Sequence, residues 1–295
     1  MHFNFDFTAA QIIWTLTFAA QLVLLVVLLG RDRAGRFPWF TASIVLLALK
    51  LLANRLLFGR LPVLTLNAIF IAMADLGVIV GLLVLLEIAR RAFRGARRRT
   101  SIAGALALLA VAIGILSVWG PWPAWKTITA DSALATLRLM QLGALKGDLL
   151  VDLLSVELGF IVVLFGRRYN AGWRSHSQRI VIGLSTASLA QLAAQGIWQI
   201  IARTAAPHTQ AEYDRIIGLR DKLFNGSGAV YVAVLVWWIV CLWIDEPGAA
   251  AAAVAPPEIS AQSESLSLEG AELVSEGSNV EPVAAPAEWK TENEP

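Results

Sequence analysis

Four polar side chains capable of chemistry lie near the centres of long apolar stretches of the sequence. They are Lys50, Asp75, Glu157 and Gln191, and counting about 1.5 Å of helix per residue places them at similar depth. A lysine stem reaches about 6 Å, whereas the nearest membrane interface lies about 15 Å away, so Lys50 requires a partner inside the bundle or must stay uncharged. We predict an ion pair between Lys50 and Asp75 or Glu157.

Amide side chains extend this polar group along two helical faces. In "SLAQLAAQGIWQIIAR", glutamines recur at every fourth residue, a spacing that places them on one side of a helix. Asn54 follows Lys50 at the same interval. The predicted intramembrane polar cluster consists of Lys50, Asn54, Asp75, Glu157, Gln191, Gln195 and Gln199.

Three interpretations of this cluster remain open. Ionisable residues inside a membrane often mark a ligand, ion or proton site. Polar side chains also join transmembrane helices, so the cluster is equally explained as a structural lock. The third interpretation is a set of separate residues adapted to lipid. No catalytic constellation, cofactor motif or metal-ligand set is recognisable, and the histidines His2, His176 and His208 all fall outside the apolar runs, which argues against a bis-histidine membrane haem.

Composition identifies the environment of these residues. The 295-residue chain is 57% hydrophobic and 16% charged, with a mean hydropathy of +0.64, whereas soluble domains carry about 25% charged residues. Runs of about 20 apolar residues cross a bilayer as helices. The sequence predicts an all-α, polytopic seven-helix bundle in residues 1–245, with spans at about 9–29, 39–58, 63–88, 101–119, 149–166, 180–202 and 226–244.

Charge predicts the orientation of the bundle. The first, third and fifth connections carry three, six and four arginines, and Lys/Arg-rich short loops face the cytoplasm. The N-terminus is therefore expected outside and the C-terminus inside. Residues 246–295 hold ten Glu and one Lys with much Ala, Pro and Ser, a composition typical of a disordered acidic tail. The external connections before the fifth and seventh spans have helical spacing, and we expect helices there too.

The third connection is rich enough in arginine to contact anionic lipid headgroups. Its arginines are Arg90, Arg91, Arg94, Arg97, Arg98 and Arg99. No nucleic-acid partner is expected. A weak repeat relates "LLGRDRAGRFPWF" and its following span to "LFGRRYNAGWRSHSQR" and its span, pairing Lys50 with Gln191. The repeat predicts two parallel three-helix halves around a linking fourth helix.

In layout, the chain resembles bacterial seven-helix inner-membrane proteins and the seven-helix sensor regions of signalling proteins. The features that carry this resemblance are the outside N-terminus, the arginine-rich first loop ending in "RFPWF" (Arg36–Phe40) and the cytoplasmic C-terminus. It implies a multi-pass protein of the bacterial cytoplasmic membrane, receptor-like, with a small ligand and a cytoplasmic protein partner. The alternative is a small-solute or proton-coupled transporter that uses the same cluster. An enzyme is not expected.

Overall fold

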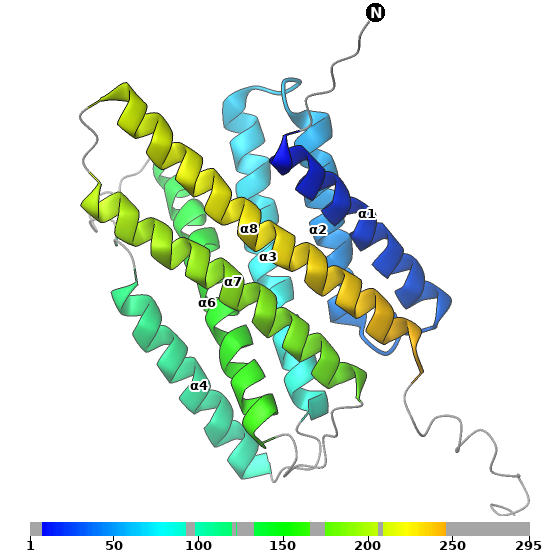
Figure 1. Ribbon diagram of the computed structural model, residues 1–295. Coiled ribbons are helices and arrows are strands. Elements are labelled where there is room, and N and C mark those ends of the chain that lie inside the picture. The colour runs from blue at the N-terminus through cyan, green and yellow to red at the C-terminus, as the bar shows by residue number, and fades with distance from the viewer. Residues whose placement is uncertain are drawn as a thin grey trace, which may run out of the picture. The chain divides into compact units, whose positions relative to one another are not determined.

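Helices account for all the regular structure that is described. Figure 1 shows the computed structural model, which describes residues 8–92, 98–119, 122, 133–165, 175–205 and 209–245. Within these ranges the chain forms seven helices and no strand, as the all-α prediction requires. The helices are α1 (Ala9–Gly30), α2 (Pro38–Leu57), α3 (Val63–Ala92), α4 (Arg98–Val118), α6 (Ala133–Phe165), α7 (His176–Thr204) and α8 (Gln210–Trp243).

Several predicted features fall outside the described residues. They are the acidic tail 246–295, Arg94 and Arg97, and the side chains of Arg98 and Arg99. The two helices expected in the external connections are present, but each continues without a break into the following span. For this reason α6 begins at Ala133 and α8 at Gln210, well before the predicted starts of their spans.

Local sequence explains where several helices begin. Thr8 and Gln11 form a capping box at α1, with each side chain hydrogen-bonded to the other residue's backbone N–H. Pro38 occupies the first turn of α2, where its missing N–H costs nothing. Ser175 caps α7 and Thr209 caps α8 through their hydroxyl oxygens.

Five of the described helices are long and apolar enough to cross a membrane by length and composition: α1, α2, α3, α7 and α8. The apolar part of α4 is shorter, Leu106–Val118. In α6 the apolar residues are interrupted by Lys146, Asp148, Asp152 and Glu157. The chain therefore has the character of a helical membrane protein, while crossing by α4 and α6 stays a prediction.

Six of the helices form a closed ring. The contacting neighbours are α1–α2, α2–α3, α3–α6, α6–α7, α7–α8 and α8–α1. Contacts between α3 and α7 reach across the ring, and among the described helices α4 packs on α6 alone, at the edge of the bundle in Figure 1. The predicted repeat of two parallel halves, α1–α3 and α6–α8, stays a prediction, because contacts between helices consecutive in sequence account for most of this order without it.

One end of the ring is filled by apolar side chains, and we call it the packed end. Its residues come from the C-terminal halves of α1, α3, α6 and α8 and the N-terminal halves of α2 and α7, so α2 and α7 run opposite to the other four helices of the ring. At its centre Phe40 and Trp238 stack edge to face, with ring centroids 5.1 Å apart. Close packing of these buried side chains fills this end of the ring.

Polar groups tie the packed end together at its rim. Glu87 of α3 is 9% exposed, and its Oε2 accepts the backbone N–H groups of Trp39 and Phe40 at 3.1 and 3.2 Å. Its other oxygen accepts from Arg91 at 3.3 Å. A carboxylate placed at the N-terminus of α2 satisfies unpaired donors and complements the helix dipole. The loop after α1 is joined to the end of α8, because Arg33 donates to Asp245 at 2.8 Å.

Candidate functional site

Two adjoining cavities lie within the ring. The deeper one has a volume of about 460 Å³ and extends to Trp238 in the packed end, while the other has about 750 Å³ and is lined by residues such as Asn54 and Gln141. The residues common to both are Leu47, Lys50, Ala74, Asp148 and Tyr231. The two cavities therefore adjoin at these residues, which place a lysine, an aspartate and a tyrosine on otherwise largely apolar walls.

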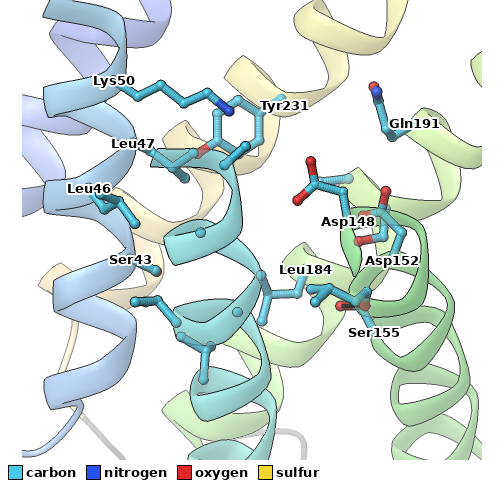
Figure 2. Close-up of a pocket in the computed structure, with 18 of the residues that line it drawn as sticks. Ser43, Leu46, Leu47, Lys50, Asp148, Asp152, Ser155, Leu184, Gln191 and Tyr231 are labelled. Carbon is cyan, nitrogen blue, oxygen red and sulfur yellow. Dashed lines mark hydrogen bonds between the residues drawn. The ribbon is translucent and has the colours of Figure 1, made fainter. Parts of the chain in front are cut away.

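Lys50 extends from α2 into this space, with Tyr231 nearby and Asp148 on the opposite side (Figure 2). The predicted ion pair with Asp75 or Glu157 is wrong. Within the described part of the chain Lys50 forms no ion pair. For Glu157 the reason is geometric, because α2 does not pack against α6 and α3 stands between them. Asp75 is on α3, which does pack against α2, but its carboxylate lies at the α3–α6 contact.

The carboxylates that face Lys50 belong to α6. Asp148 and Asp152 are one turn apart, so both side chains point into the deeper cavity from the same helix face. Ser188 of α7 lines the same cavity as Asp152, and Asp148 is close enough to Lys50 and to Asp75 for electrostatic interaction. These two aspartates were absent from the predicted cluster.

Asp75 and Glu157 lie elsewhere in the bundle. Asp75 is packed at the α3–α6 contact, where its Oδ1 is 3.5 Å from the position a Cβ on Gly143 would occupy. Glu157 lies farther along α6, and both its oxygens are buried without a hydrogen-bond partner among the described residues. Neither side chain lines a described cavity, so the structure brings neither of them to Lys50.

The amides of the predicted cluster are split between the cavity and the packing. Gln191 lines the deeper cavity and its Oε1 accepts a hydrogen bond from the Ser227 hydroxyl at 2.8 Å. Asn54 lines the second cavity. Gln195 and Gln199 follow on the same helix but line none of the described cavities. Only the inner member of the glutamine series therefore faces the space in front of Lys50.

A second hydrogen-bonded pair of side chains joins α1 to α8 beside the second cavity. Gln21, 1% exposed, donates from Nε2 to the Tyr231 hydroxyl at 3.4 Å, and both residues line the second cavity. Neither Gln21 nor Tyr231 belongs to the predicted polar cluster. Gln21 is the one amide in the middle of an otherwise apolar first span, and Tyr231 is the only hydroxyl-bearing ring in the last, which were the available signals.

This arrangement provides one cation, two carboxylates and several hydrogen-bonding groups around a space that admits a small molecule. Pockets of about 300–1,000 Å³ with a few convergent polar groups are typical of ligand sites. Among the described residues no group of three or more His, Cys, Asp or Glu is placed to hold a metal ion. The geometry favours binding of a polar solute.

Comparison of the chain with protein-family models, with characterised proteins and with solved structures found no significant match. The functional interpretation therefore depends on the geometry of the cavity.

Proposed function

We propose that this chain is a seven-helix integral membrane protein, receptor-like in action, that binds a small polar solute in the cavity between α1, α2, α3, α6, α7 and α8. The single observation that carries the proposal is the cavity, which brings Lys50, Asp148 and Asp152 to one space and ends against the apolar core at Val84 and Trp238. In this proposal the solute enters from the end away from that core. The proposed location is the cytoplasmic membrane of a bacterium.

The proposed direction of opening follows from charge. Arg31, Arg33, Arg90, Arg91 and Arg179 all belong to the packed end of the helices. The positive-inside rule places that end at the cytoplasm, and the cavity then opens outward. Anionic lipid headgroups would contact the arginines exposed at this end. A cytoplasmic protein would bind the same end and respond to its conformation.

In this proposal the solute acts on helix packing. A ligand shifts an equilibrium only by its difference in affinity for the two states. The cavity is lined by α2 and α6, which do not touch each other, so a solute bridging them would draw the walls together. Movement of α2 would then reach the packed end through Phe40 and through Glu87, which holds the start of α2.

The second candidate is a transporter that uses the same cavity. The observation that favours it is the pair Asp148 and Asp152, one turn apart beside an unpaired lysine, because adjacent carboxylates in a membrane cavity are a common arrangement for proton exchange. Transport additionally requires the packed end to open, which would separate Phe40 from Trp238.

Binding and flux separate these candidates. The protein in lipid nanodiscs is tested by thermal unfolding against a panel of polar solutes, with Lys50→Met as the cavity variant and Lys222→Met, on the exposed part of α8, as the matched control. We expect stabilisation of wild type and Lys222→Met but not of Lys50→Met. A solute that binds yet shows no flux in proteoliposomes supports the receptor, and flux supports the transporter. Equal responses of the two variants would contradict a cavity site.

A further inference from the structure

The cavity separates opposite charges on two walls. Lys50 belongs to α2, and Asp148 and Asp152 belong to α6. These two helices share no contact, and the cavity lies between them. Figure 2 shows the lysine side chain extending toward the side from which the two carboxylates project. Within the described residues these groups form no ion pair with one another.

Such separation is energetically unfavourable without an occupant. A charge removed from bulk water is stabilised only by a partner and by hydrogen bonds, and an unpaired charge in a partly enclosed space costs free energy. A direct Lys50–Asp148 pair would relieve this cost, yet no such pair is formed within the described residues. The space between them is thus matched to a molecule that carries both charges itself.

The geometry points to a small zwitterion of the amino-acid type as the ligand, with its carboxylate at Lys50 and its ammonium group at Asp148 and Asp152. This inference depends on the proposed solute-binding function and specifies its ligand class. Charge-assisted hydrogen bonds at both ends of the ligand would be stronger than neutral ones. A solute with one charge would satisfy one wall and leave the other unpaired.

The remaining lining fits the rest of such a molecule. Gln191 and Ser227 present an amide and a hydroxyl beside the carboxylates, and the Tyr231 hydroxyl lies between the cavities. A cavity of about 460 Å³ is within the range of small-ligand sites. The rest of the lining is mainly apolar, with side chains such as Leu46, Val84 and Trp238, and would accommodate an apolar side chain of the amino acid.

The test uses the full-length protein in lipid nanodiscs and titration calorimetry. Each proteinogenic L-amino acid is titrated singly, followed by two relatives of every binder, the amine that lacks its carboxylate and the acid that lacks its amine. Neutral sugars and polyols form the third group. We expect at least one amino acid to bind, and each singly charged relative to bind about ten- to a hundred-fold more weakly, the effect of one charged hydrogen bond.

Variants assign the two ends of the ligand. Lys50→Met and Asp148→Asn are each expected to weaken amino-acid binding about ten- to a hundred-fold, whereas Lys50→Arg retains it. The matched controls Lys222→Met and Asp221→Asn, both on an exposed part of α8, are expected to leave Kd unchanged. Circular dichroism and size-exclusion chromatography confirm that each variant is folded.

The outcomes distinguish this inference from the function on which it depends. If a singly charged or neutral solute binds as tightly as every amino acid, the zwitterion is wrong while solute binding stands. If amino acids bind and Lys50→Met binds them as wild type does, the assignment of the two walls is wrong. If no solute in the three groups binds, both the ligand class and the proposed function are contradicted.

Discussion

Glu87 offers a quantitative test of how the packed end is held. Its Oε2 accepts two backbone N–H groups at the start of α2, from Trp39 and Phe40, and its Oε1 accepts from Arg91. Glu87→Gln retains an oxygen for the backbone donors but removes the charge. Glu87→Met removes every acceptor while keeping a side chain of similar length.

The two substitutions therefore differ in cost. Loss of charge at a helix N-terminus, with loss of a partly exposed ion pair, is worth about 1 kcal/mol. Glu87→Met also leaves the N–H of Phe40 unsatisfied in a fully buried residue, at about 1–3 kcal/mol, and that of the half-exposed Trp39 at about 0.5–1.5 kcal/mol. We expect a free energy of unfolding about 1 kcal/mol lower for Gln and about 2.5–5.5 kcal/mol lower for Met.

Reversible unfolding in mixed detergent micelles measures these free energies. Leu86→Met, at the neighbouring exposed position, is the control and should be within about 0.5 kcal/mol of wild type. Equal losses for Glu87→Gln and Glu87→Met would refute the role of the two backbone hydrogen bonds, because the oxygen retained by Gln would then have no effect.

Two further predictions concern packing and the rim. Gly147→Ala should lower the unfolding free energy by about 1–3 kcal/mol, because the added Cβ would lie 2.6 Å from a methyl carbon of Val78. Gly114→Ala meets open space and should raise the unfolding free energy by about 0.5–1 kcal/mol. The same effect at both glycines would contradict close α3–α6 contact. Asp245→Asn, which removes the charge facing Arg33, should cost about 1 kcal/mol because Asp245 is 67% exposed, and added salt should reduce that difference; a difference insensitive to salt would exclude an ion-pair origin.

The helices were largely predictable because they depend on local sequence. Apolar run length located the helices, and Pro38 marked the start of α2 within one residue. The early starts of α6 and α8 were harder to predict. Their first turns have helical spacing but mixed charge, and nothing local distinguishes a separate surface helix from a continuous one.

The functional site was only partly predictable. Depth along the helices singled out Lys50 and Gln191, and both line the deeper cavity, but depth says nothing about direction around a helix axis. Glu157 is central in its span yet lies away from the cavity, whereas Asp148 and Asp152 face it. The four-residue interval between these aspartates was the available signal. Which helix stands opposite Lys50 depends on the ring order, a tertiary property that no single segment encodes.

The measurement that tests the central claim most directly is the reactivity of single cysteines with a charged, membrane-impermeant methanethiosulfonate added from outside. In a Cys241→Ala background, Leu47→Cys places a thiol on the wall shared by the two cavities, and Ile88→Cys places one in the packed core. Only a thiol in contact with water ionises and reacts.

The account predicts modification of Leu47→Cys and none of Ile88→Cys, with the reaction at Leu47→Cys slowed by any solute that binds. An unreactive Leu47→Cys, or equal reactivity at the two positions, would contradict a water-filled cavity that is open on the outer side and sealed at the packed end.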